Sequence, residues 1–81
     1  MLTELSNKAK VVGAKQVRRA LESGRALAVF LADDADPRVT EPIAEACAEK
    51  GVRAEAAPSM KELGRACGIS VGAAVAATVT E

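Results

Sequence analysis

The sequence predicts one α/β domain spanning residues 1–81, folded as a three-layer α/β/α sandwich around a small sheet of about four strands. Segments with helical apolar spacing alternate with short apolar runs of strand length, an order typical of such sandwiches. The run Leu27–Leu31 is continuously apolar, as expected of a strand covered by helices on both faces. A hydrophobic content of 49% with 27% charged residues favours a globular domain over a disordered chain.

The first third of the chain is expected to hold two helices before the central strand. An N-terminal helix is favoured by apolar residues at helical spacing, namely Leu2, Leu5, Ala9 and Val12. Residues 11–13 could instead form a brief strand. The second helix is expected to run from about residue 14 to residue 23 and to stop at Gly24, a good residue for a helix C-terminus.

The acidic segment Ala32–Pro37 is expected to be a loop that leads into a third helix. Asp36 can cap this helix, and Pro37 suits its first position. Pro42 is awkward in a helix interior and leaves two alternatives. Either the first turn is separate and Thr40 caps the main helix, or Pro42 falls early enough to be tolerated. Gly51 is expected to end the helix.

The last third continues the alternation. Residues 52–56 alternate in polarity, which indicates a strand with one solvent-facing side. Ser59 and Glu62 have the spacing of a capping box, and Gly68 is a good end for the short helix that follows. Gly64 inside this helix costs about 1 kcal/mol relative to alanine, which is best explained by close helix packing. Residues 69–72 are expected to be a loop, and residues 73–79 a closing strand, although their alanine content would also suit a helix.

The composition excludes several classes of function. Phe30 is the one aromatic residue, which disfavours sheet surfaces that stack single-stranded RNA on aromatic rings. With no histidine, the usual general base and the commonest metal ligand are both missing, so an enzyme is the weakest expectation. No cofactor is expected.

Cellular location is indicated by the cysteines and by the apolar runs. Cys47 and Cys67 have no zinc-site spacing and are expected to be small buried hydrophobes in a reducing compartment, with a disulfide as the minor alternative. No signal peptide is evident, and no apolar run approaches the ~20 residues of a membrane helix. A cytoplasmic protein without a membrane partner is therefore expected.

The formal net charge is zero, but the charges are segregated along the chain. Residues 8–25 carry six cations against the single anion Glu22, a net charge of +5. The rest of the chain carries the compensating negative charge. This distribution is expected of a protein that presents one basic surface and repels polyanions elsewhere.

The segment Gly13–Arg19 is the candidate for that basic surface. Lys15 and Gln16 lie in the first turn of the expected helix, and Arg19 follows one turn later, so the three side chains converge. Unpaired backbone N–H groups and the helix dipole favour anions at the same place. An amide that reads a base edge, with cations for phosphate, makes a plausible nucleic-acid surface. The plainer alternative is a solvated helix face.

Two further groups of residues invite a chemical interpretation. Asp33, Asp34 and Asp36 follow a predicted strand, where carboxylates can hold magnesium, although a capped and solvated loop is the better interpretation. Ile69 and Val71 lie between two glycines. In such a loop they are exposed unless something covers them, or they turn inward, and sequence does not orient loop side chains.

Three stretches resemble the L7Ae family of ribosomal proteins and its small bacterial homologues, which bind kink-turn RNA. They are G-A-K-Q-V-R-R-A-L (residues 13–21), A-D-D-A-D-P (residues 32–37) and L-G-R-A-C-G-I-S-V-G-A-A (residues 63–74). The resemblance covers almost the whole chain. It implies an α/β/α sandwich with a four-stranded mixed sheet, and a partner RNA duplex sharply bent at a short bulge beside tandem sheared G·A pairs.

The resemblance also implies roles for particular residues. The family's helix-start motif is usually Gly-x-Asn-Glu and meets the G·A pairs, and Lys15 and Gln16 stand at its last two positions, as in bacterial homologues. Arg19 matches a basic position that holds phosphate or guanine, and Asp36 matches an acidic position near one extruded base. The loop residues match the segment beside the extruded nucleotides. The RNA contacts implied are Gly13, Ala14, Lys15, Gln16, Arg18, Arg19, Asp36, Ile69, Ser70 and Val71.

The function expected is that of a non-enzymatic, ribosomal protein-like RNA-binding protein. It would recognise and stabilise kink-turns in structured RNA, such as ribosomal RNA or a riboswitch, and act as a monomer in a ribonucleoprotein. The alternative is a protein-interaction or ribonucleoprotein scaffold domain of the same fold without kink-turn specificity.

Overall fold

The computed structural model describes residues 9–80 and contains seven elements of regular structure. In chain order these are β1 (Lys10–Val12), α2 (Ala14–Glu22), β2 (Ala26–Ala32), α3 (Pro37–Lys50), β3 (Arg53–Ala57), α4 (Met60–Ala66) and β4 (Val75–Val79). None of the helices within these residues combines the length and the apolar character needed to cross a membrane.

The four strands form one mixed sheet with the order β1-β4-β2-β3. β4 pairs antiparallel with both β1 and β2, and β2 pairs parallel with β3. Ala76 of β4 lies between Val12 of β1 and Phe30 of β2. β4 is therefore an inner strand, and all five of its residues are buried.

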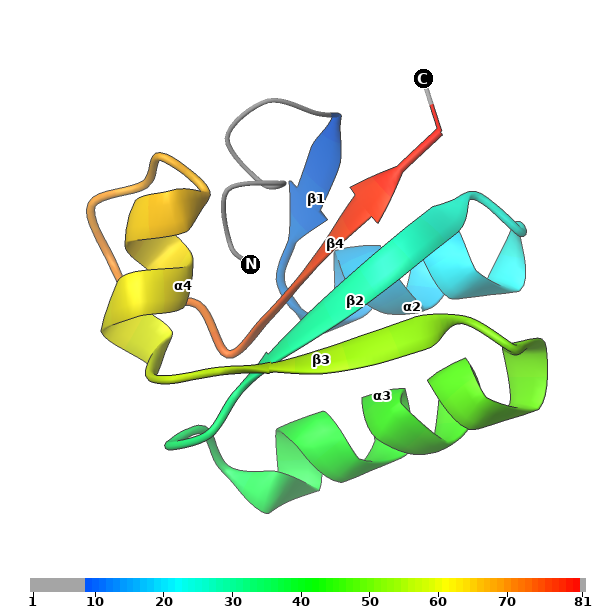
Figure 1. Ribbon diagram of the computed structural model, residues 1–81, viewed down its shortest axis with the longest axis horizontal. Coiled ribbons are helices and arrows are strands. Elements are labelled where there is room, and N and C mark those ends of the chain that lie inside the picture. Colours follow the sequence, from blue (N-terminus) through cyan, green and yellow to red (C-terminus); the bar gives the residue numbers. More distant parts are fainter. Residues whose placement is uncertain (1–8, 81) are drawn as a thin grey trace.

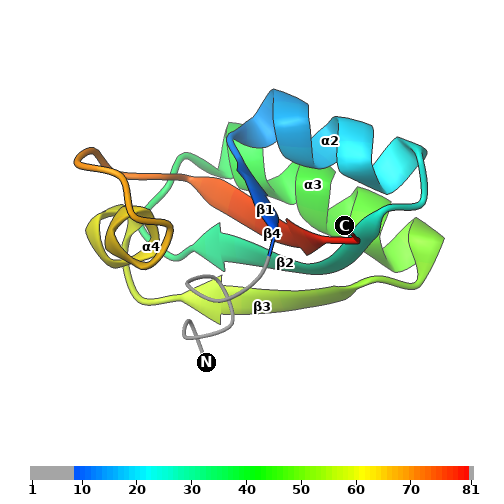
Figure 2. The same cartoon turned by 90° about the horizontal axis from the view of Figure 1, so that it is seen from above.

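Helices cover both faces of the sheet, which confirms the predicted three-layer sandwich. α2 and α3 pack on one face, and α4 packs on the other (Figures 1 and 2). Val29 faces α2 and α3, whereas Phe30 faces α4, because successive strand residues point to opposite sides of the sheet. Each face has its own apolar core, built mainly from alanine, valine, leucine and isoleucine.

The N-terminal helix predicted from Leu2, Leu5, Ala9 and Val12 is wrong at its C-terminal end, and its first part lies outside the described residues. Residues 10–12 form β1, as in the strand alternative. These residues form a strand because they pair with β4 through backbone hydrogen bonds, a contact between distant parts of the chain. The N–H of Val79, for example, donates to the carbonyl of Ala9 at 3.0 Å.

α3 is one continuous helix through Pro42, so the alternative of a separate first turn is wrong. The Asp36 carboxylate caps it by accepting from the N–H of Arg38, and Pro37 occupies its first turn as predicted. Pro42 is exposed and lies early in the helix, where its missing N–H affects only one carbonyl of the first turn. Gly51 ends the helix in the left-handed conformation with φ 69°.

The other boundaries follow the predictions closely, with two exceptions in burial. β3 was predicted to have one solvent-facing side, but residues 53, 54 and 56 are all exposed, so this edge strand is open on both faces. Residues 75–79 are a strand, so the helix alternative for the closing segment is wrong. Leu27 belongs to the predicted doubly covered run but is 51% exposed. The pairing between β2 and β4 shifts by one residue between Ala26 and Ala28, and this irregularity takes the intervening Leu27 out of the core.

Candidate functional site

The candidate site residues gather at one end of the sheet because of the strand directions. β1, β2 and β3 all run opposite to β4, so their C-terminal ends lie beside the start of β4. The start of α2, the turn 33–36 before α3 and the loop 67–74 before β4 all emerge there (Figure 1). Segments 50 residues or more apart in the chain thus share one end of the molecule.

Gly13 joins the two main parts of the candidate site. Its N–H donates to the carbonyl of Val75 at 3.0 Å, so the start of α2 is tied to the residue that begins β4. Gly13 has φ 103° and ψ 149°, a conformation that favours glycine. The N–H of Ala32, at the end of β2, donates to the carbonyl of Ala74 at 2.9 Å, so the acidic turn after Ala32 is tied to the residues that lead into β4.

The side chains of α2 divide cleanly into a buried and an exposed face. Val17, Ala20 and Leu21 are buried. Lys15, Gln16, Arg18 and Arg19 are all exposed. The exposed set contains three cations and an amide, and no acidic residue lies in the first turn. Any anionic partner therefore meets these groups directly.

The N-terminus of α2 has no side-chain cap, in contrast to those of α3 and α4. Asp36 caps α3, and Ser59 caps α4 by accepting from the N–H of Glu62 at 3.1 Å. Lys15, moreover, places a positive charge in the first turn, where the helix dipole is unfavourable to cations. Fold stability does not explain this arrangement, whereas a bound anion would benefit from the cation and the free N–H groups.

Arg18 points to a different side of α2 from Gln16. Residues two apart in a helix are separated by about 160° around the axis when measured the short way. Gln16 and Arg18 therefore flank the exposed face on opposite sides, with Lys15 and Arg19 between them. The structure does not bring Arg18 and Gln16 together, although both are accessible.

The loop before β4 presents apolar side chains to solvent. Val71 is 69% exposed and Ile69 is 37% exposed, so the alternative in which they turn inward is wrong. Ser70 between them is also exposed. These two branched side chains, close together on one short loop, form a small exposed apolar patch of the kind that a partner can cover.

Gly64 and Gly72 allow α4 and this loop to approach each other closely. A β-carbon on Gly64 would collide with the carbonyl oxygen of Val71. A β-carbon on Gly72 would lie 3.2 Å from the β-carbon of Met60. The prediction of close packing at Gly64 is confirmed, but the neighbour is loop backbone rather than another helix.

Asp36 is held by Arg38 in addition to its role as a cap. The guanidinium donates to both carboxylate oxygens, at 2.8 Å from Nη2 to Oδ2 and at 3.3 Å from Nε to Oδ1. These side-chain bonds, followed by the bond from the Arg38 backbone, hold the pKa of Asp36 below its ordinary value. Asp36 is exposed and ionised at the edge of the candidate site.

Asp34 has a role that the sequence patterns did not reveal. Its Oδ1 accepts from the N–H of Met60 at 2.8 Å, across 26 residues of chain. Asp34 and Asp36 thus accept hydrogen bonds from two different helices. Within residues 9–80, no three acidic or cysteine side chains are grouped as metal ligands. No local pattern could have signalled the contact between Asp34 and Met60.

The two cysteines lie in different cores on opposite sides of the sheet. Cys47 packs with α2 and α3, and Cys67 packs with α4. Both are buried free thiols, so the predicted hydrophobic role is confirmed and the disulfide alternative is wrong. Burial raises the pKa of both thiols.

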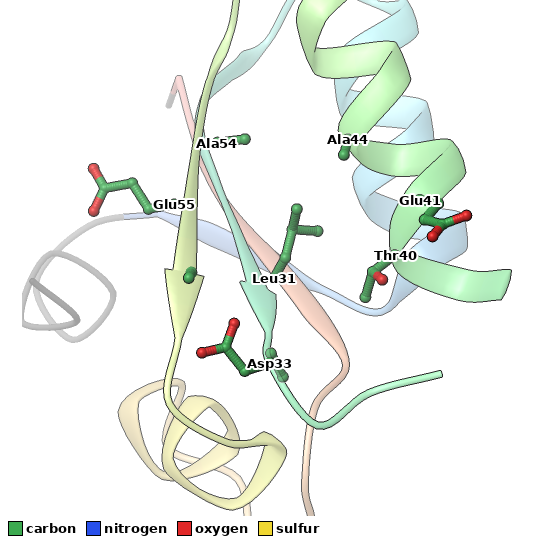
Figure 3. A pocket seen from close by; sticks show the side chains of 9 residues that line it. Leu31, Asp33, Thr40, Glu41, Ala44, Ala54 and Glu55 are labelled. Atoms are coloured by element: carbon green, nitrogen blue, oxygen red, sulfur yellow. The ribbon is translucent and has the colours of Figure 1, made fainter. Parts of the chain in front are cut away.

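A shallow hollow lies between α3 and the strands β2 and β3 (Figure 3). Its lining residues are Leu31, Ala32, Asp33, Thr40, Glu41, Ala44, Ala54, Glu55 and Ala56. None of the ten predicted RNA contacts lines it. The carboxylate of Glu55 points away from the hollow (Figure 3). Asp33 belongs to the acidic turn, so the hollow borders the candidate site at that turn, but the predicted contacts themselves lie outside it.

Several known proteins are similar to this chain in sequence. RNA-binding protein TTE2299 of Caldanaerobacter subterraneus subsp. tengcongensis is 50% identical over 70 residues, which cover 86% of this chain and 85% of that protein. RNA-binding protein YbxF of Geobacillus stearothermophilus is 46% identical over 67 residues, covering 83% of this chain and 82% of that protein. Large ribosomal subunit protein eL8 of Halobacterium salinarum is 38% identical over 68 residues, 83% of this chain but 57% of that protein.

A solved structure, the Giardia lamblia 15.5kD RNA binding protein, superposes with a TM-score of 0.88 at 32% identity. The match covers 99% of this chain and 68% of that one. The family model described as ribosomal protein L7Ae/L30e/S12e/Gadd45 matches residues 2–81. The chain therefore belongs to the ribosomal protein L7Ae/L30e/S12e/Gadd45 family.

Proposed function

We propose that this protein is a cytoplasmic, monomeric and non-enzymatic RNA-binding protein that recognises and stabilises kink-turns in structured RNA, such as ribosomal RNA or a riboswitch. One observation carries the proposal. The bond from Gly13 to Val75 holds an uncapped, basic helix start beside an exposed apolar loop. The names of the bacterial relatives and of the Giardia structure, all RNA-binding proteins, support RNA as the partner.

The start of α2 meets the tandem G·A pairs in this proposal. Lys15 donates to guanine O6 or N7, and the Gln16 amide both donates to and accepts from a base edge. Arg19, one turn along the same exposed face, binds phosphate or guanine. Gly13 and Ala14 let the RNA approach the backbone N–H groups, and Arg18 adds charge on the far flank.

The loop and the acidic turn meet the bulged nucleotides. Ile69 and Val71 pack against the faces of the extruded bases, with Ser70 between them. Stacked apolar contact of this kind needs no aromatic side chain when the RNA supplies the rings. Asp36 accepts from an extruded base, since its carboxylate is ionised and exposed.

Stabilisation of the kink follows from linkage. An RNA that exchanges between extended and kinked forms shifts toward the form that the protein binds more tightly. The size of the shift equals the difference in binding free energy for the two forms. A surface that contacts G·A pairs on one side and extruded bases on the other fits only the kinked form.

The experiment compares two RNA duplexes that differ only at the tandem G·A pairs. One carries the kink-turn, and in the other the G·A pairs are replaced by Watson–Crick pairs. Fluorescent labels at the two ends report bending by energy transfer, and titration gives both affinities. We expect binding to be tighter for the kink-turn duplex, on the order of tenfold or more, and energy transfer to rise only there.

Equal affinities for the two duplexes would refute kink-turn recognition. Binding of neither RNA, together with a defined protein partner, would favour the alternative of a ribonucleoprotein scaffold domain. The presence of Lys15 and Gln16 at the usual Asn and Glu positions makes this control essential, since the base contacts depend on those side chains.

A further inference from the structure

The loop Ile69–Gly72 is fixed to α4 by backbone contacts. The N–H of Ile69 donates to the carbonyl of Gly64 at 3.1 Å. The N–H of Ala73, directly after the loop, donates to the carbonyl of Met60 at 3.0 Å. Between these two bonds, the carbonyl of Val71 lies against the α-carbon side of Gly64. The conformation of the loop therefore depends on where α4 lies.

The first turn of α4 is held in turn by Asp34. The N–H of Met60 is one of the groups that a helix start leaves without an internal partner. The Asp34 carboxylate accepts from this N–H at 2.8 Å, while the Ser59 hydroxyl oxygen accepts from the N–H of Glu62. The Asp34 carboxylate also carries the sign of charge that the helix dipole favours at this end.

Met60 is thus hydrogen-bonded on both sides. Its N–H reaches back to the turn between β2 and α3, and its carbonyl reaches forward to Ala73. The same turn carries Asp36, two residues after Asp34. One peptide unit on each side of Met60 therefore connects the acidic turn with the end of the apolar loop.

We propose that Asp34 is a positioning residue that acts through Met60 to fix the first turn of α4 and, with it, the conformation of the loop Ile69–Gly72. Asp34 also sets the loop relative to Asp36, because it belongs to the turn that carries that residue. The consequence for RNA rests on the proposed function. Without the Asp34 bond, Ile69 and Val71 are held less firmly in place for extruded bases.

The charge of Asp34 and its hydrogen bond to Met60 predict opposite effects on RNA affinity when Asp34 is replaced. Asp34 is exposed near a surface proposed to bind a polyanion, so its charge repels RNA. Removal of a repelling charge strengthens binding. Removal of a positioning bond weakens it.

The experiment uses three variants of the whole chain. Asp34→Ala removes both charge and acceptor, and Asp34→Asn removes the charge but keeps an oxygen acceptor. Asp33→Ala is the matched control, because it removes a neighbouring exposed charge whose carboxylate accepts no hydrogen bond within residues 9–80. Amide hydrogen exchange is followed at Ile69 and Ala73, with Ala77 in the buried strand β4 as the internal reference.

We expect Asp34→Ala to speed exchange at Ile69 and Ala73 on the order of fivefold while Ala77 is unchanged. Asp34→Asn and Asp33→Ala should leave the loop amides close to wild type. With the kink-turn duplex, Asp34→Ala should weaken binding on the order of fivefold, whereas Asp33→Ala should leave it equal or stronger.

Unchanged exchange at Ile69 and Ala73 in Asp34→Ala would overturn the proposal, and so would an equal rise at Ala77, which indicates a loss of global stability. Tighter RNA binding by Asp34→Ala would overturn it as well, since charge would then dominate. The exchange measurement needs no RNA. If the wild-type protein binds no kink-turn, the proposed function fails and exchange alone decides the role of Asp34.

Discussion

The carbonyl oxygen of Val71 occupies the place where a β-carbon on residue 64 would have to be, so Gly64 and Val71 are in direct backbone contact. Gly64 is buried in the middle of α4, and Val71 is the most exposed large apolar residue within residues 9–80. The contact explains how a loop can present an apolar side chain to solvent and still have a defined conformation. The backbone of Val71 packs against α4, although its side chain is exposed.

Substitution of Gly64 by alanine should destabilise the fold, although the same change stabilises most helices. Alanine gains about 1 kcal/mol over glycine in a helix interior. The collision with Val71 costs about 1–3 kcal/mol, as for other overpacked sites, because the neighbour is backbone rather than a flexible side chain. Urea unfolding monitored by circular dichroism should therefore give a lower midpoint.

A rise in the free energy of unfolding for Gly64→Ala would contradict the close contact. It would mean that the loop moves away at little cost and that helix propensity decides the result. The affinity for the kink-turn duplex separates the two cases further. It should fall if the contact holds the loop in its binding conformation.

Arg19→Ala should weaken RNA binding and reduce its salt dependence. Arg19 is exposed in the middle of the basic face of α2 and is proposed to bind phosphate or guanine. Loss of one phosphate contact lowers the slope of log affinity against log salt by about 1. Titrations of the kink-turn duplex at several salt concentrations provide this slope.

Arg25→Ala is the matched control for Arg19→Ala. It removes the same exposed charge, but Arg25 follows Gly24 beyond the C-terminal end of α2, opposite the candidate site. The control should change the slope little. Equal changes in both variants would mean that RNA responds to the overall charge and not to this helix face.

The features that sequence predicted correctly are those set by neighbours in the chain. Asp36 caps α3 through Arg38, two residues away, and Ser59 caps α4 through Glu62, three residues away. The stop at Gly51 is equally local, since a left-handed residue ends the helix. The alternation of these helices with apolar strands was sufficient to predict the three layers.

The features that sequence left open or missed depend on contacts between distant segments. Residues 10–12 form a strand because they pair with β4. Val11, for example, pairs with Ala77, which lies 66 residues later in the chain. The bond between Asp34 and Met60 spans 26 residues. Periodicity contains no information on such partners, and so Asp34 was grouped with Asp33 and Asp36 as a possible metal cluster or solvated loop.

Loop orientation was the third feature outside the reach of sequence. Ile69 and Val71 had two possible orientations, and the outward one depends on Gly64 and Gly72. Because Gly64 and Gly72 have no side chains, the loop backbone packs directly against α4, and the side chains of Ile69 and Val71 face solvent. The glycines were visible in the sequence, but their neighbours were not.

Asp36 both caps α3 and forms an ion pair with the Arg38 side chain. The pH dependence of stability in Asp36→Asn should separate these two roles. The Arg38 side chain, and then its backbone N–H, lower the pKa of Asp36 in the folded state. A carboxylate with a lowered folded pKa contributes stability above its unfolded pKa of about 4, and this contribution disappears as the pH falls through the lowered value. Asparagine still caps a helix but does not pair with Arg38 as an anion.

The difference in unfolding free energy between wild type and Asp36→Asn should therefore be constant near neutral pH and shrink below about pH 4. Urea midpoints measured from pH 7 to pH 3 test this. The position is exposed, so the difference is expected to be small. A difference that grows as the pH falls would contradict the lowered pKa.

Lys15→Glu should stabilise the fold and abolish specific RNA binding at the same time. Lys15 lies in the first turn of α2, where the helix dipole favours an anion, and Arg19 one turn later is a like charge. Glutamate corrects both interactions, so the free energy of unfolding should rise by about 0.3–1 kcal/mol. The same glutamate repels phosphate and cannot donate to guanine O6 or N7.

Opposite signs in the two measurements are the outcome that identifies Lys15 as a binding residue. A lysine retained for stability would give a loss in both. A solvated surface lysine would give the same gain in the free energy of unfolding with no loss of affinity beyond that of a charge change elsewhere on the surface. Arg25→Glu carries the same change in charge outside α2 and controls for general repulsion of RNA. The affinity lost by Lys15→Glu beyond that of Arg25→Glu measures the contact at the G·A pairs. Equal losses in the two variants would assign the effect to net charge and remove Lys15 from the proposed interface.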